Sequence, residues 1–161
     1  LSFKLKVYVS DPGFEKKNGK IICKYNNNII VQDEIQNVII TNLNDALDQC
    51  DFIMITCSLH KHTHHLINKK NILKAKKGVK IINVARGSIV KEDDIVDLLE
   101  KGFISSVGFD VFEIEPLPLN SKLRDFDQNL YGSHNGSITI EAVDRTSIIA
   151  IEKINDFLIN N

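Results

Sequence analysis

Short runs of β-branched and apolar residues recur along this chain and are separated by polar or amphipathic segments. The runs at 5–10, 51–57, 79–85 and 104–111 have the length and composition of β-strands, and a shorter run stands at 129–131. Apolar positions in these runs are nearly continuous, which is typical of parallel strands that are buried on both faces. The pattern therefore predicts a parallel sheet.

Helical periodicity fills the segments between the later strands. Residues 91–101 form an amphipathic pattern that ends at Gly102, with Ile95, Val96, Leu98 and Leu99 on one face. Shorter helices are expected from an N-cap at Asn44 to Gln49 and from Asn71 to Lys77. A single turn or loop is expected at 121–127. The last helix, 140–158, has apolar residues at helical spacing that we expect to pack against the core.

The segment from 13 to 41 gives a weaker signal. Apolar runs at 21–23 and 29–31 flank the Asn26–Asn28 stretch, which predicts a hairpin or irregular structure rather than a helix. Alternating strands and helices over the rest of the chain place the protein in the α/β class.

Composition narrows the class of protein. The 161 residues are 43% hydrophobic and 25% charged, which suits one globular domain. The net charge of −1, with both signs interspersed, argues against a nucleic-acid or membrane-surface partner. The three cysteines contain no C-x-x-C pair, so we expect reduced thiols and a cytoplasmic location.

Polar side chains that can carry chemistry gather after the predicted strands. Arg86 follows the 79–85 strand, Asp110 and Glu115 lie at or after the end of the next strand, and His134 follows 129–131. The carboxyl ends of parallel strands meet at one edge of a sheet, so we expect these four residues at one rim. Gly87 would permit a close backbone approach there.

These residue types suit acid–base chemistry on an anionic substrate. A guanidinium presents a planar, permanently charged fork that matches a carboxylate, which is the role expected for Arg86. A carboxylate bonded to an imidazole stabilises the protonated ring, which suits a general acid–base near neutral pH. Glu115 and His134 are the candidates for that pair.

At these residues the chain resembles the NAD-dependent D-2-hydroxyacid dehydrogenases, most closely their D-3-phosphoglycerate dehydrogenase branch. The resemblance is found in three segments, which are VKIINVARGSIV at 79–90, VGFDVFEIEP at 107–116 and GSHNGS at 132–137. The resemblance implies a Rossmann-like, doubly wound parallel sheet and hydride transfer between nicotinamide and a D-2-hydroxy or 2-oxo acid. It implies catalytic roles for Arg86, Glu115 and His134, and points to 3-phosphoglycerate as the substrate.

The resemblance also implies NAD as the cofactor. Asp11 would hold the adenosine ribose and select NAD over its phosphorylated form, and Asp110 would face the nicotinamide. The full set of expected cofactor-binding positions is Asp11, Pro12, Cys57, Ser58, Val84, Ala85, Arg86, Asp110, His134 and Gly136.

The chain departs from the family pattern at its N-terminus. No G-x-G occurs, and the first expected strand already ends at Asp11, so residues 1–161 are interpreted as a partial NAD-binding domain. It would lack the first β–α unit and the substrate domain. In the usual strand order the absent strand lies between the strand ending at Asp11 and the one ending near Cys57.

Two interpretations of this partial domain remain open. The chain is either a catalytic part that works only when completed, and is inactive alone, or a non-catalytic remnant that self-associates. Exposed strand edges at the gap favour pairing with a second copy, so we expect a homo-oligomer such as a dimer. A further alternative is a metal-dependent hydrolase that uses His60, His62, His64 and His65 as ligands, although this cluster lacks the Asp of the comparable metal motif. We expect no native metal site.

Overall fold

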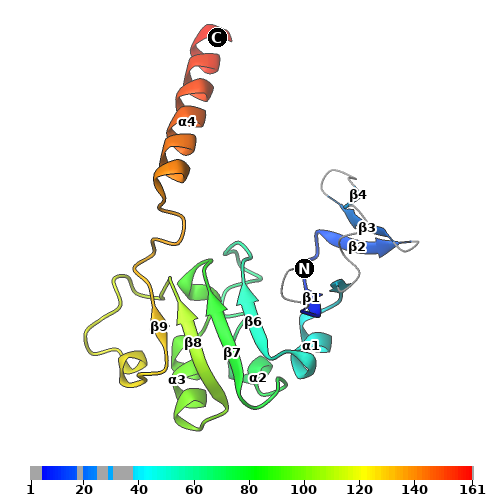
Figure 1. Ribbon diagram of the computed structural model, residues 1–161, viewed down its shortest axis with the longest axis vertical. Coiled ribbons are helices and arrows are strands. Elements are labelled where there is room, and N and C mark those ends of the chain that lie inside the picture. The colour runs from blue at the N-terminus through cyan, green and yellow to red at the C-terminus, as the bar shows by residue number, and fades with distance from the viewer. Residues whose placement is uncertain (1–4, 18–19, 25–28, 31–37, 161) are drawn as a thin grey trace.

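A parallel four-stranded sheet forms the centre of the computed structural model, which describes residues 5–17, 20–24, 29–30 and 38–160. The strand order is β6-β7-β8-β9, and each neighbouring pair is parallel (Figure 1). The strands are β6 (Phe52–Ile55), β7 (Val79–Asn83), β8 (Ile104–Phe109) and β9 (Leu130–Tyr131). The predicted α/β class and parallel sheet are confirmed.

Two helices cover one face of this sheet (Figure 1). They are α2 (Lys69–Ile72) and α3 (Glu92–Glu100), and α3 buries the apolar face predicted from its periodicity. The core between sheet and helices includes Ile81, Ile95 and Phe109. The helix predicted at 71–77 is wrong in its bounds, because Asn68 caps the helix by accepting a hydrogen bond from the Asn71 amide at 3.1 Å.

The opposite face of the sheet is open at β6. Ile53 and Ile55 point into the core, whereas Phe52 and Met54 are 56% and 63% exposed. The prediction of a fully buried strand at 51–57 is therefore wrong, since only one of its faces is covered. The Lys80 ammonium group lies over the Phe52 ring, 5.1 Å from its centroid.

The N-terminal strands form two separate small sheets. β1 (Val7–Val9) pairs in parallel with β5 (Val38–Ile40), and no pairing joins β1 to β6 among the described residues. β2 (Phe14–Lys17), β3 (Lys20–Cys23) and β4 (Ile29–Ile30) form an antiparallel sheet, which confirms the hairpin prediction. The Asn26–Asn28 stretch lies outside the described residues.

Short helical turns complete the connections. α1 (Leu43–Ala46) continues into a 3-10 helix, η1 (Leu47–Gln49), and its N-cap is Asn42 rather than the predicted Asn44. η2 (Gly87–Ile89) follows β7, and η3 (Lys122–Asp125) gives the single turn that was expected between 121 and 127.

The last helix, α4 (Ile140–Asn160), projects away from the sheet (Figure 1). All 21 of its residues are described and none of them is buried. The helix itself was predicted, but the expectation that it packs on the core is wrong. Among the described residues, no helix combines the length and apolar character that crossing a membrane requires.

Candidate functional site

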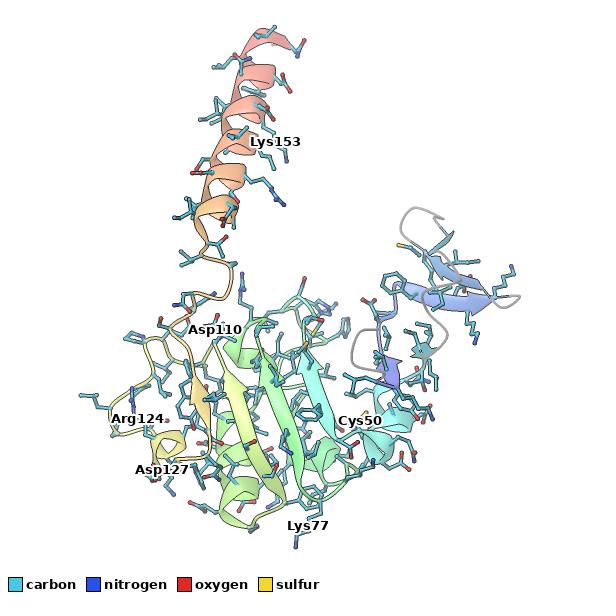
Figure 2. All side chains as sticks on the ribbon, viewed as in Figure 1. Cys50, Lys77, Asp110, Arg124, Asp127 and Lys153 are labelled. Carbon is cyan, nitrogen blue, oxygen red and sulfur yellow. The ribbon has the colours of Figure 1, made fainter. Side chains whose placement is uncertain are left out.

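The loops that follow β7, β8 and β9 meet at the carboxyl edge of the sheet. Figure 2 shows Asp110 at this edge and Lys77 at the opposite one. Parallel strands produce this arrangement because all of their carboxyl ends point the same way. Arg86, Glu115 and His134 leave the sheet through these three loops, as the sequence predicts.

Asn83, at the end of β7, shapes the loop that carries Arg86. Its side chain is fully buried; Nδ2 donates to the Arg86 carbonyl at 3.0 Å and Oδ1 accepts from the Ala85 amide at 3.1 Å. The Arg86 guanidinium donates to the Ala85 carbonyl at 2.6 Å, and the residue is exposed. The loop thus exposes the Arg86 cation to solvent, on a backbone that the buried Asn83 side chain holds in place by hydrogen bonds.

Gly87 brings the loops after β7 and β8 into direct backbone contact. A Cβ atom at this position would lie 1.8 Å from the carbonyl carbon of Phe112 and 2.4 Å from the amide nitrogen of Glu113. The close approach expected at Gly87 is therefore made by the Phe112 backbone. Glycine is needed here for space, so the separation of the two loops depends on it.

His134 and Glu115 form the predicted pair. The His134 Nδ1 atom lies 2.7 Å from Glu115 Oε2, and Oε1 of the same carboxylate accepts from the Phe112 amide at 3.0 Å. The hydrogen bond from His134, with that from Phe112, holds the pKa of Glu115 below its ordinary value, and the Arg86 charge acts in the same direction. The carboxylate is therefore ionised and oriented toward the ring.

Asp110 fixes the loop on which His134 sits. Its carboxylate accepts from the amides of Asn135 at 3.2 Å and Gly136 at 2.8 Å, while its carbonyl accepts from the His134 amide at 2.8 Å. These bonds hold His134 in a left-handed backbone conformation, with φ of 56°, which histidine adopts more readily than most residues. Asp110 thus has a positioning role that the sequence did not reveal.

The expected cofactor residues follow several strands: Asp11 and Pro12 follow β1, Cys57 and Ser58 follow β6, and Val84 and Ala85 follow β7. Burial raises the pKa of the Cys57 thiol, and the negative charge of Asp11 adds to that rise. Asp11 also accepts a hydrogen bond from the Gly13 amide at 2.7 Å. Pro12, Ser58 and Val84 are exposed, whereas Ala85 is buried.

The histidines from 60 to 65 do not converge. The His60 and His62 rings meet edge to face with centroids 5.8 Å apart, while His64 stacks on His65 at 3.9 Å. His65 binds Glu113 instead, with Nε2 2.8 Å from Oε1. In the described part of the chain, no group of three or more His, Cys, Asp or Glu side chains is placed to hold a metal ion.

Two further features of the site, besides the role of Asp110, escaped the sequence analysis. Asn83 was visible only as a polar residue within a buried apolar run, which is a usable signal because buried amides need partners. The contact between His65 and Glu113 joins residues that lie 48 positions apart, and no local pattern predicts it.

Comparison with known proteins identifies related chains. Residues 18–136 match the family model described as D-isomer specific 2-hydroxyacid dehydrogenase, NAD binding domain. A glyoxylate reductase of Thermofilum pendens is 39% identical over 124 residues, which covers 77% of this chain and 37% of the relative. A D-3-phosphoglycerate dehydrogenase of Bacillus subtilis is 41% identical over 98 residues, covering 61% of this chain and 18% of the relative.

The fold is also that of a solved structure. D-Lactate dehydrogenase from Aquifex aeolicus, complexed with NAD and lactic acid, superimposes with a TM-score of 0.79 at 23% identity. The match covers 99% of this chain and 48% of the other. This chain therefore spans less than half the length of each of these three proteins.

Proposed function

Because the chain belongs to the D-isomer specific 2-hydroxyacid dehydrogenase family, we propose that it is the NAD-binding part of an oxidoreductase acting on a D-2-hydroxy acid. The observation that carries this proposal is the bonded His134–Glu115 pair, with exposed Arg86 on the neighbouring loop of the same edge. The set combines a proton-transfer group, its orienting carboxylate and a cation for the substrate carboxylate.

Each side chain has a defined task in this proposal. A carboxylate can only accept a hydrogen bond, so the bond to Glu115 places a proton on Nδ1 of His134 and leaves Nε2 for exchange with the substrate hydroxyl. Arg86 holds the substrate carboxylate and orients C2. The carboxylate of Glu115 stabilises the imidazolium that forms when His134 takes the proton.

The carboxyl edge suits a dinucleotide. NAD, when bound, accepts or supplies the hydride at its nicotinamide ring. Asp11 would bind the adenosine ribose, Pro12, Cys57 and Ser58 would line the adenosine end, and Val84, Ala85, Asp110 and Gly136 the nicotinamide end. The positions of Asp11 shortly after β1 and of Cys57 shortly after β6 support this placement. The three free cysteines support a cytoplasmic location.

Among D-2-hydroxy acids, 3-phosphoglycerate is our first candidate, on the basis of the Ser-His-Asn sequence at 133–135. Glyoxylate is the alternative, because a glyoxylate reductase is similar to this chain at nearly the same identity as a phosphoglycerate dehydrogenase. Reduction of phosphohydroxypyruvate and of glyoxylate, measured side by side, decides between them.

The direct test is a titration of the purified chain with NADH, followed by nicotinamide fluorescence, with the oligomeric state measured in the same sample. Saturable binding of NADH with weaker binding of NADPH is expected, because Asp11 would repel a 2′-phosphate. Replacing Asp11 with Asn should reduce this discrimination. Absence of binding at millimolar NADH in every oligomeric state would contradict the proposal.

A second candidate function, self-association, is favoured by the exposed apolar surface of α4. Its large exposed residues include Ile140, Val143, Ile151, Ile154 and Leu158, which share one helical face. Proteins that function as monomers rarely expose apolar patches larger than a few hundred Å². We propose that a second copy of the chain covers this face. Light scattering across a concentration series tests it, and a monomer throughout would exclude it.

A further inference from the structure

His65 lies between the two loops that carry Arg86 and Glu115. Its backbone amide donates to the Ser88 carbonyl at 2.9 Å, two residues after Arg86. Its side chain reaches the other loop, where Nε2 lies 2.8 Å from Oε1 of Glu113, two residues before Glu115. One residue thus contacts both loops, through its backbone and its side chain respectively.

Glu113 is itself fixed, so the contact has a firm anchor. Its amide donates to Oε1 of Glu92 at 2.6 Å, and the Glu92 amide donates to Oε1 of Glu113 at 3.4 Å. This reciprocal pair ties the loop after β8 to the first turn of α3. Burial raises the pKa of Glu92, and the nearby charge of Glu113 adds to the effect.

The backbone of His65 supports the same interpretation. Its φ of 50° lies in the left-handed region, which non-glycine residues adopt at a cost that surrounding contacts must offset. Those contacts are the bond to Ser88, the bond to Glu113 and the stacked His64 ring, whose centroid is 3.9 Å away. In this conformation the His65 ring contacts Glu113.

We propose that His65 is a positioning residue that sets the distance between the Arg86 loop and the Glu115 loop through its bond to Glu113. The catalytic significance of this distance rests on the proposed function of Arg86 and Glu115. Loss of the bond should let the 112–116 segment shift relative to the Arg86 loop and weaken the contact between Glu115 and His134.

The pKa of the Glu115 carboxyl reports that contact in the chain as it exists. We would measure it by carbon-detected NMR titration in wild type, His65→Ala and Glu113→Ala, with His62→Ala as the control for loss of an exposed histidine in the same segment. In both test variants the pKa of Glu115 should rise toward its ordinary 4.5, while His62→Ala should leave it unchanged. Glu113→Gln, which keeps an acceptor for His65, should restore much of the wild-type value.

Glu113→Ala excludes a purely electrostatic explanation. Removing a negative charge near Glu115 would by itself lower the pKa of that carboxyl, whereas release of the loop raises it. A rise in Glu113→Ala therefore supports the positioning role. If the melting temperature falls in the variants while Glu115 titrates as in wild type, His65 is only structural and the proposal is overturned.

If either His65→Ala or Glu113→Ala fails to fold, the other variant still tests the proposal, because each removes one partner of the bond between His65 and Glu113. The measurement needs neither cofactor nor turnover. Failure to bind NADH would thus overturn the proposed function without affecting this result, and an unchanged Glu115 titration would overturn the role of His65 alone.

Discussion

Nδ1 of His134 lies 2.7 Å from Oε2 of Glu115, and this contact joins the loop after β9 to the loop after β8. The two residues are 19 positions apart and meet only because β8 and β9 are parallel neighbours. The contact makes the stability of the folded chain depend on the ionisation of one carboxyl group.

We expect this dependence to appear at acid pH. The pKa of Glu115 is lower in the folded chain than its ordinary 4.5, so its contribution to stability is present above 4.5 and is lost as the pH falls through the folded value. Urea unfolding of wild type and Glu115→Gln should therefore differ at pH 7, and the difference should shrink as the pH falls below 4.5. A difference that stays constant over this range would contradict the assignment.

Substitution of Gly87 by Ala should destabilise the chain strongly. The new Cβ would overlap the Phe112 carbonyl group, with contacts of 1.8 and 1.9 Å to its carbon and oxygen. Such overpacking against backbone costs about 1–3 kcal/mol or more. The free energy of unfolding from urea denaturation measures the loss.

Gly108→Ala is the matched control for Gly87→Ala. A Cβ there would meet only the Ile82 Cγ1 atom, at the ordinary distance of 3.9 Å. We expect this variant to unfold at nearly the same urea concentration as wild type. Equal losses at the two glycines would show that the close approach at Gly87 is not what limits the substitution.

Asn83→Ala should affect both stability and the Arg86 loop. The substitution leaves the Arg86 carbonyl and the Ala85 amide without their buried partner, and each unsatisfied group costs about 1–3 kcal/mol. Amide hydrogen exchange should speed up at Ala85 most of all. The exposed Asn120→Ala serves as the control, and equal protection of Ala85 in both variants would contradict the role of Asn83.

A further prediction concerns catalytic turnover and can be tested in any oligomer or complex of the chain that shows reductase activity. His134→Ala should lower kcat by roughly 10²-fold or more, which is the scale of general acid–base catalysis, and should leave NADH affinity much less affected. Stopped-flow absorbance of NADH separates the two quantities. Turnover within a few-fold of wild type would remove His134 from the proposed mechanism.

Local patterns predicted the elements whose residues face one continuous core. The periodicity of α3 identified its buried face, and the polar residues after β7, β8 and β9 identified the edge that carries the site. Both signals are local, because the spacing of apolar residues in a helix and the end of a strand can be recognised from neighbouring residues in the sequence. The pair formed by Glu115 and His134 followed from a family resemblance and from the parallel topology.

Other features could not be predicted because they depend on what covers a surface. The sequence predicted that Phe52, Met54 and the apolar face of α4 are buried. Apolar residues on one face indicate that burial of that face is favourable, but they do not indicate which partner buries it. The loop contacts of Asp110 and His65 were missed for a related reason. They are backbone and side-chain bonds between distant segments, which composition and spacing do not encode.

The exposed face of α4 leads to the last prediction. A helix that buries no side chain gains stability only from its own hydrogen bonds and propensities, and such helices are marginal in water. If a second copy covers α4, the helical circular dichroism signal and the apparent mass should rise together with chain concentration.

The double variant Ile151→Glu with Ile154→Glu should abolish both increases, because it places charges at positions that are 67% and 61% exposed and share the apolar face. Its sheet should melt as in wild type, since no residue of α4 is buried against it in the described structure. Glu152→Gln, on the polar face, should associate normally. Association that is insensitive to the double variant would assign the contact to another surface, with the open edges of β1 and β6 as the next to test.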